Sequence, residues 1–446
     1  MPKNYYGEQT EKAIKNFPFD THGWHKEFLM ALAQVKKATA MANFEAENFN
    51  KEIKNAIVMA ADEVLAGLST SLKSSKFKDQ FVLPALMGGA GTSIHMNMNE
   101  VLASRATEIL KGKHIVDAND HVNRSQSTND VNPTAIKVAT AILLKNLSDS
   151  LENLSRAFEG KAKEFKNVVK LGRTHMQDAV PITLGQEFGA YACIVRQHLA
   201  EIKRVKKIAE SLHLGGSAVG NSANASSKYI ASVYKQLSRV TGHKFNKVKN
   251  FIAHTGSAGD FLQISQAVTA LCMDMSKIAT DLRMMSSGPR GGLGEIILTE
   301  LQKGSSIMPG KVNPVMPETV NNLYYWVTGN NLSIEQAAHG ANLQLSVMIP
   351  TIADRLIESV KMSAQVFQVF AEKCVVSIKA DQKRCKENLE RSTAYATLLT
   401  PIFGYQKMSE IVKETINSGK TLREIVVNEK LLTNKEFDKI VNSFRP

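Results

Sequence analysis

A short stretch of the chain, residues 304–314 (GSSIMPGKVNP), combines side chains that could bind and deprotonate a carboxylate-bearing molecule. Its two glycines and two prolines are incompatible with a regular helix or strand, so the stretch is predicted to be a mobile loop. Its polar side chains are two serine hydroxyls, a lysine ammonium and an asparagine amide, namely Ser305, Ser306, Lys311 and Asn313. All of these groups donate hydrogen bonds, as recognition of a carboxylate requires. Composition alone leaves an ordinary polar surface loop equally open.

Metal and nucleotide sites are not indicated by the sequence. The four cysteines lie far apart without paired metal-ligand spacing, and the histidines add no such motif. The glycines at 88–91 and 214–215 lack the lysine of a phosphate-binding loop and the strand context of a dinucleotide fold. We therefore interpret these glycines as tight turns and expect no metal site.

Helical periodicity dominates the elements that must position the loop. Apolar residues recur every three to four positions in 191–213, in 262–285, after Pro350, and from Ile142 to Leu154. Alternating, strand-like runs are nearly absent. Long helices with few breakers predict an all-α protein built on an extended helix bundle.

Three domains are predicted from changes in pattern along the chain. Residues 1–130 mix shorter helices with Gly-rich and Asn-rich loops, and residues 131–385 form the central long-helix bundle. Residues 386–446 form a small C-terminal helical domain, in which Thr-x-x-Glu pairs beginning at Thr421 and Thr433 match the capping-box spacing.

Composition excludes several classes of protein. The chain has 446 residues, of which 43% are hydrophobic, and its net charge is 55 − 42 = +13. Because the lysines are scattered among acidic residues, we interpret the charge as a solvated basic surface that attracts small anions, not as a nucleic-acid footprint. There is no apolar signal segment at the start and no apolar run long enough for a membrane span. Dispersed cysteines fit a reducing compartment, so a cytoplasmic protein is expected.

The string GSSIMPGKVNP resembles the signature of the aspartase/fumarase superfamily, which includes class II fumarase, aspartase, argininosuccinate lyase and adenylosuccinate lyase. Blocks 89–93, 125–130 and 172–187 are also similar to this superfamily, and the similarity extends over nearly the whole chain. The resemblance implies an all-α, three-domain lyase whose long central bundle forms the helical core of a homotetramer. Each active site would combine segments of three subunits.

The resemblance also implies roles for individual residues. Ser305 would be the general base that takes a proton from the carbon beside a carboxylate. Asn129 and His175 would lie nearest the leaving group, with Glu318 paired to His175. The other side chains would bind the substrate's carboxylates: Thr92, Ser127, Thr128, Thr174, Ser306, Lys311 and Asn313. Proton removal beside a carboxylate creates extra negative charge, and such a set of fixed donors would stabilise it.

Several details resemble aspartases more than class II fumarases. A serine follows Thr92 where fumarases usually carry glutamine, and residues 315–318 and 343–348 are also similar to aspartases. The resemblance therefore implies reversible deamination of L-aspartate to fumarate and ammonia without an organic cofactor. Activation by a divalent metal ion is left open. Class II fumarase and a catalytically inactive structural homologue remain the alternatives.

Three positions depart from the superfamily pattern. His95 stands where asparagine is usual, and Asn221-Ser222 stands where a Thr-Gly pair is usual. Asp117-Ala118 replaces the usual His-Pro before Asn119. The first two changes lie close to the substrate-binding blocks, where they could alter specificity.

Overall fold

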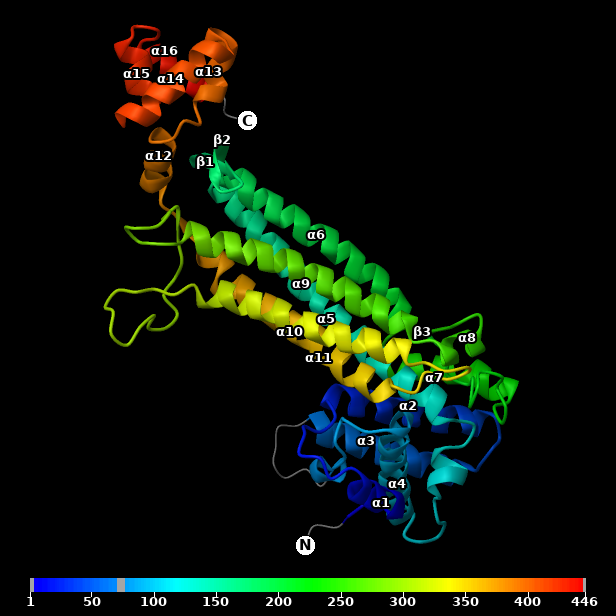
Figure 1. The fold of residues 1–446 in the computed structure, drawn as a ribbon. Helices are drawn as coiled ribbons and strands as arrows, with labels where there is room; N and C mark the ends of the chain where they lie inside the picture. The colour runs from blue at the N-terminus through cyan, green and yellow to red at the C-terminus, as the bar shows by residue number, and fades with distance from the viewer. Residues whose placement is uncertain (1–3, 70–76, 444–446) are drawn as a thin grey trace. The chain divides into compact units, whose positions relative to one another are not determined.

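The computed structural model describes residues 4–69 and 77–443 (Figure 1). The chain divides into two compact units. Unit 1 comprises Met1–Asp149, His198–Cys272 and Leu323–Gln365, and unit 2 comprises Ser150–Gln197, Met273–Asn322 and Val366–Pro446. Helices dominate and the strands are short, so the all-α prediction is confirmed. The three-domain division stays a prediction. Among the described residues, no helix combines the length and apolar content that crossing a bilayer requires.

The longest helices carry the predicted periodicity, and each has one part in unit 1 and the other in unit 2. They are α5 (Thr128–Glu164), α6 (Leu184–Ala209), α9 (Gly259–Met285), α10 (Val315–His339) and α11 (Ile349–Lys373). Their apolar stripes are buried at the spacing of one helix turn, as at Leu144, Leu147, Leu151 and Leu154 of α5. The predicted long helix bundle is therefore confirmed.

Unit 1 adds shorter elements around its part of these helices. They are α1 (Glu8–Asn16), α2 (Lys26–Glu45), α3 (Lys51–Ser69), α4 (Thr92–Ile109), α7 (Ser227–Thr241), α8 (Phe251–Gly256), and the parallel pair β3 (Ser211–Leu212) and β4 (Asn246–Lys247). Helix α2 packs against α3 and α7 through small and apolar residues such as Leu32 and Val35, which are fully buried. Between the long helices, Lys137 of α5 forms an ion pair with Asp260 of α9 at 2.5 Å.

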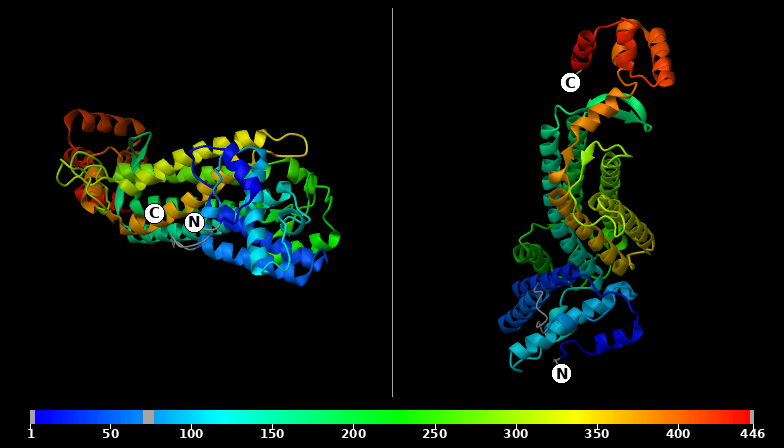
Figure 2. Two further views of the ribbon diagram at one scale, coloured as in Figure 1. Left: turned by 90° about the horizontal axis from the view of Figure 1, so that it is seen from below. Right: turned by 90° about the vertical axis from the view of Figure 1, so that its left-hand side faces the viewer.

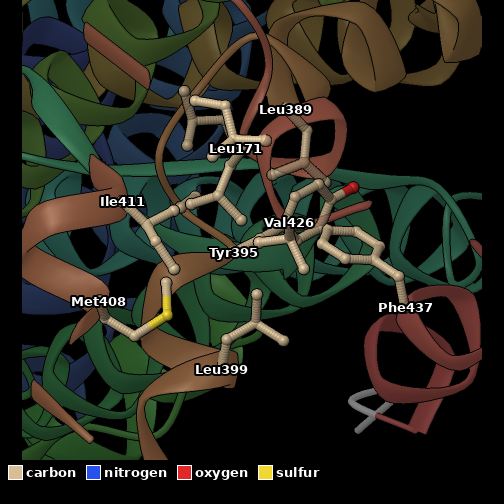
Figure 3. Packing of buried hydrophobic residues seen from close by; sticks show 11 residues of the cluster. Leu171, Leu389, Tyr395, Leu399, Met408, Ile411, Val426 and Phe437 are labelled. Carbon is tan, nitrogen blue, oxygen red and sulfur yellow. The ribbon is translucent and has the colours of Figure 1, made fainter. Parts of the chain in front are cut away.

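Unit 2 contains the C-terminal helices and most of the strands. Its elements are the hairpin β1 (Val169–Thr174) and β2 (Gln177–Thr183), the antiparallel pair β5 (Ile296–Ile297) and β6 (Lys379–Ala380), and the helices α12 (Gln382–Glu390), α13 (Ala396–Phe403), α14 (Tyr405–Ser418), α15 (Leu422–Asn428) and α16 (Asn434–Ser443). Helices α13 to α16 group together in orange and red (Figure 2). Leu171 of β1 belongs to the apolar core of this group, together with Tyr395 and Phe437 (Figure 3).

Both predicted capping boxes are present in the C-terminal helices. Glu424 accepts a hydrogen bond from the Thr421 backbone N–H at 2.7 Å, and the Thr421 hydroxyl accepts one from the Glu424 N–H at 3.2 Å. Thr433 and Glu436 form the same reciprocal pair, at 2.8 and 3.3 Å. Each pair satisfies two backbone donors at the start of a helix.

The hairpin of β1 and β2 is a feature that the sequence did not predict. Thr174 pairs with Gln177, so the connecting loop consists of only His175 and Met176, with φ values of 53° and 65°. Two-residue hairpin loops with positive φ usually contain Asn-Gly or a similar pair. His-Met gives no such signal, and the register shift at Gly172 also interrupts the strand alternation.

Candidate active site

The predicted site residues are distributed between the two units. Unit 1 holds Thr92, Ser127, Thr128 and Asn129, which lie at or just before the starts of α4 and α5. Unit 2 holds Thr174 and His175 at the hairpin tip, and Ser305, Ser306, Lys311, Asn313 and Glu318 in and after the loop that precedes α10.

Asp130, to which the sequence assigned no role, organises the start of α5. Its carboxylate is fully buried and accepts hydrogen bonds from the backbone N–H groups of Ser127 at 2.9 Å, Gly215 at 2.9 Å and Ser217 at 3.0 Å. Burial raises the pKa of Asp130, whereas these three N–H groups act to lower it. The carboxylate thus fixes the backbone of the Ser127 segment relative to the 215–217 loop.

Asn132 holds the loop that leads into α4. Its side-chain amide donates to the carbonyl oxygens of Ala90 at 3.2 Å and Gly91 at 3.0 Å. Gly91 has a φ of 78°, and a Cβ atom there would lie 2.7 Å from the Asn132 amide nitrogen, so glycine is required at this position. The exposed Thr92 follows directly, and its hydroxyl donates to the Gly89 carbonyl at 2.8 Å.

Asn129 is held through both its side chain and its backbone. Its side-chain amide donates to the Ala218 carbonyl at 2.7 Å. Its own carbonyl would ordinarily accept the N–H four residues later in the helix, but that residue is Pro133, which has none. His213 Nε2 lies 3.2 Å from this carbonyl and takes the place of the missing donor. Burial lowers the pKa of His213 to about 3, so the ring is neutral and Nε2 carries the proton.

A buried lysine lies behind Thr128. Lys36 Nζ is 2.5 Å from His95 Nε2, 2.8 Å from Gln126 Oε1 and 3.1 Å from Asn123 Oδ1. Three acceptors match the three N–H donors of an ammonium group. The other ring nitrogen of His95, Nδ1, lies 2.7 Å from the Thr128 hydroxyl oxygen.

This arrangement determines which way the Thr128 hydroxyl donates. Burial lowers the pKa of Lys36, whereas the charge of Asp130 acts to raise it, and the three surrounding acceptors favour the ammonium form. An ammonium can only donate, so His95 Nε2 accepts and the proton of the neutral ring is on Nδ1. Burial, reinforced by the charge of Lys36, lowers the pKa of His95 and keeps the ring neutral. Nδ1–H donates to the Thr128 oxygen, so the hydroxyl proton of Thr128 is free to bind an anion. Asparagine is usual at position 95 in the superfamily, and its side-chain amide is a hydrogen-bond donor. His95 therefore keeps a donor at this position, which is directed at the Thr128 oxygen.

In unit 2, the loop before α10 places two backbone amides on Ser305. Its hydroxyl oxygen accepts hydrogen bonds from the N–H groups of Ile307 at 3.2 Å and Met308 at 3.1 Å. Asn313 donates from its side chain to the Gly304 carbonyl at 2.7 Å and so joins the two ends of the loop. Amide donors on a serine oxygen stabilise its alkoxide form, which a serine base requires.

The remaining polar residues of this loop face solvent. Ser306, Lys311 and Glu318 are exposed, as is His175 at the tip of the hairpin. Within the described part of one chain, no hydrogen bond or ion pair joins His175 to Glu318, so their pairing stays a prediction. The Lys311 ammonium is likewise an exposed cation suited to an anionic ligand.

Buried charges anchor the base of the hairpin that carries Thr174 and His175. Glu295 is fully buried, and its carboxylate lies 2.8 Å from Arg173 Nη1 and 3.0 Å from Lys170 Nζ. Lys170 also contacts Glu187 at 2.8 Å. These carboxylates raise the pKa of Lys170 although its burial acts to lower it. The sequence indicated the Arg173 block but not this network, because Glu295 lies 122 residues from Arg173 along the chain.

Small cavities lie beside predicted site residues in both units. Asn313 lines the one in unit 2, together with Leu298 and Pro317. Thr128 and Asn129 line a small cavity in unit 1, with polar groups of His254, Ser257 and Ser346. A larger cavity in unit 2 contains none of the predicted site residues. Among its charged lining residues, Arg423 contacts both Glu390 at 3.1 Å and Asp438 at 2.6 Å.

Comparison with known proteins agrees with the geometry. The sequence pattern of the family described as Lyase matches residues 2–329, and that described as Fumarase C C-terminus matches residues 396–445. The aspartate ammonia-lyase of Bacillus subtilis (strain 168) is 42% identical over 444 residues, which is 99% of this chain and 92% of that protein.

Two solved structures are also similar. Fumarate lyase:delta crystallin from Brucella melitensis, in its crystal structure bound to cobalt, has a TM-score of 0.93 and 40% identity, over 99% of this chain and 95% of that one. The recombinant class II fumarase from Schistosoma mansoni has a TM-score of 0.92 and 32% identity, over 98% of this chain and 95% of that one. With family matches over most of its length and relatives of this identity, the chain belongs to the aspartase/fumarase superfamily of lyases.

Proposed function

We propose that the protein catalyses the reversible deamination of L-aspartate to fumarate and ammonia. The observation that carries this proposal is 42% identity to an aspartate ammonia-lyase over 99% of the chain. The loop residues Ser305, Lys311 and Asn313, which the chemistry needs, are all present.

Ser305 is the proposed general base. Its oxygen takes the proton on C3 of aspartate, the electron pair of that C–H bond becomes the second bond between C2 and C3, and nitrogen leaves C2 with its bonding pair as ammonia. Charge develops on the carboxylate beside C3, and Lys311 and Asn313 are the proposed donors to it. The amide N–H groups of Ile307 and Met308 support the alkoxide form of the base. No electron acceptor takes part, so we propose that no organic cofactor is needed.

The proposed active form is a cytoplasmic homotetramer with active sites shared between chains. One face of α10 supports association, because Tyr325 and Leu332, seven residues apart on the helix, are 64% and 58% exposed. The neighbouring Trp326 is 59% exposed. Burying such a face against a second copy removes apolar surface from water and stabilises a closed assembly.

The reaction is tested by following the ultraviolet absorbance of the fumarate double bond with the purified protein. We expect fumarate to form from L-aspartate and, in reverse, to be consumed when ammonia is present. Fumarate formed from L-malate but not from L-aspartate would replace the proposal with a class II fumarase. Turnover of neither substrate by a folded tetramer would favour a structural homologue.

Shared active sites are tested by mixing two inactive variants. Ser305→Ala and His175→Ala are dissociated, mixed and reassociated. If each site takes these two residues from different chains, random mixing leaves roughly a quarter of the sites intact. Activity should therefore return from two inactive parents. Proven mixed tetramers without activity would mean that one chain supplies both residues, and shared sites would be refuted.

A further inference from the structure

Three potential metal ligands meet in unit 1 at a place outside the predicted catalytic residues. His22 Nε2 lies 2.8 Å, and His25 Nε2 3.0 Å, from the same oxygen, Oδ1 of Asp354. The three ligand atoms all lie within 4.8 Å of one another. Two imidazole nitrogens and a carboxylate oxygen form a donor set typical of divalent transition metals.

The backbone holds both histidines in place. The His22 carbonyl accepts a hydrogen bond from Ala85 N–H at 3.1 Å, and Gly23 pairs with Pro84 in an isolated β-bridge. His25 precedes α2 directly, and its carbonyl accepts the N–H of Phe28 at 3.0 Å. The His-x-x-His segment is therefore fixed before any ligand binds, which lowers the entropy cost of binding.

Asp354 offers one oxygen to two rings. Its carboxylate lies on the second turn of α11 and is only 8% exposed, and Arg355 Nε lies 3.4 Å from the other oxygen, Oδ2. His22 is 49% exposed and His25 is 18% exposed. The His25 Nε2 atom is buried and has no hydrogen bond of acceptable geometry, although it lies 3.0 Å from Oδ1. The contact of this buried nitrogen with Oδ1 is thus imperfectly oriented, and a cation between the three atoms would give it a better partner.

We propose that His22 Nε2, His25 Nε2 and Asp354 Oδ1 bind one divalent transition-metal ion, with zinc as the best match. Zinc bonds of about 2.0–2.2 Å place tetrahedral ligand atoms about 3.3 Å apart. The observed 2.8 and 3.0 Å separations therefore need to open by only a few tenths of an ångström. The exposed side of His22 leaves a fourth position for water. Magnesium and calcium are poor matches, because they prefer oxygen ligands.

The ion would tie the segment before α2 to α11. Helix α11 begins at Ile349, which lines the small cavity beside Thr128 and Asn129. Bound metal thus holds one wall of that cavity, and its expected effect is on stability and not on the chemical step. The inference does not depend on the proposed aspartate reaction.

The test uses the full-length protein after removal of metals with a chelator. Zinc chloride is titrated by calorimetry, and cobalt chloride is added separately to record the visible absorption of the bound ion. The variants are His22→Ala and His25→Gln, and the control is His339→Ala, which removes another exposed histidine of unit 1. His22 is half-exposed, so its replacement leaves the fold intact, and circular dichroism verifies this.

We expect one zinc ion per chain in the unmodified protein and in His339→Ala, with a raised melting temperature. Loss of either proposed ligand should weaken zinc binding by about 100-fold or more, because even partners of metal ligands contribute 10–100-fold. The zinc-dependent rise in melting temperature should disappear as well. Three results would each overturn the site. They are failure of the unmodified protein to bind zinc, zinc affinity in His22→Ala and His25→Gln equal to that of the unmodified protein, and a loss of zinc affinity in His339→Ala as large as in the ligand variants.

Discussion

Replacing Lys36 with methionine tests whether a buried lysine fixes the direction in which Thr128 donates. Lys36→Met removes the donor to His95 Nε2 and to the amide oxygens of Asn123 and Gln126. Without a donor at Nε2, the proton of the neutral ring can move there, and Nδ1 becomes an acceptor. The Thr128 hydroxyl, 2.7 Å away, then donates to the ring and no longer to a bound carboxylate.

The expected loss follows from the strength of one hydrogen bond to a charged group. Such a bond contributes about 1.5–3 kcal/mol, and 1.36 kcal/mol corresponds to a tenfold change in rate. The kcat/KM for L-aspartate should therefore fall by about tenfold to a hundredfold. Stability also falls, because each buried acceptor without a donor costs about 1–3 kcal/mol. Rates are accordingly measured well below the melting temperature of the variant.

A double-mutant cycle separates this effect from a general structural one. If Lys36 acts through Thr128, Lys36→Met should have little further effect on kcat/KM in a Thr128→Val background. His95→Asn retains a side-chain donor and should stay close to the unmodified protein. His95→Leu removes the ring that would accept the Thr128 hydroxyl proton, so it should lose less activity than Lys36→Met. Multiplicative losses in the cycle, or a loss in a folded His95→Leu variant as large as that in Lys36→Met, would refute the reasoning.

Three further predictions concern single residues. Ser305→Ala should lower kcat by about 10²–10⁴-fold with little change in substrate affinity; steady-state kinetics that retain most of the activity would exclude Ser305 as the base. Glu295→Gln should destabilise the protein by about 3–5 kcal/mol in urea unfolding, because Arg173 loses its buried carboxylate partner; an unchanged midpoint would contradict this. His213, with a pKa of about 3 when folded and about 6.5 when unfolded, should make stability decrease as the pH falls below 6.5, by up to about 1.4 kcal/mol per pH unit. The decrease arises because the unfolded chain binds a proton that the folded chain does not, and His213→Gln should reduce this slope; equal slopes would disprove it.

Much of the fold was predictable because its signals are local. The helical spacing of apolar residues indicated α9 and α11 almost to their ends, and the Thr-x-x-Glu pairs marked the starts of α15 and α16. The start of α5 was placed too late, because its first turns contain the polar residues Thr128, Asn129 and Asp130. Those residues serve the candidate site and interrupt the apolar pattern on which the prediction relied.

The candidate site was predictable as a set of residues but not as a structure. Thr128 and Asn129 were predicted as site residues from the family resemblance. The side chains that hold them were not, because Lys36 is 92 positions from Thr128 and His213 is 84 positions from Asn129. No spacing rule connects such positions. The proposed metal-ligand cluster illustrates the same limit. The sequence predicted no metal site, because Asp354 comes from α11, more than 300 residues after His22 and His25.

The hairpin tip shows how backbone strain can indicate function. His175 and Met176 both have positive φ, a conformation that costs about 1–2 kcal/mol for each residue other than glycine. Asparagine and glycine would make the same turn with less strain, so stability alone does not explain this choice. The base of the hairpin is held by the buried pair of Arg173 and Glu295 and by Leu171 in the core. An exposed histidine presented at a strained turn on a rigid base is what positioning it for a substrate requires, and this argument for His175 is independent of any resemblance.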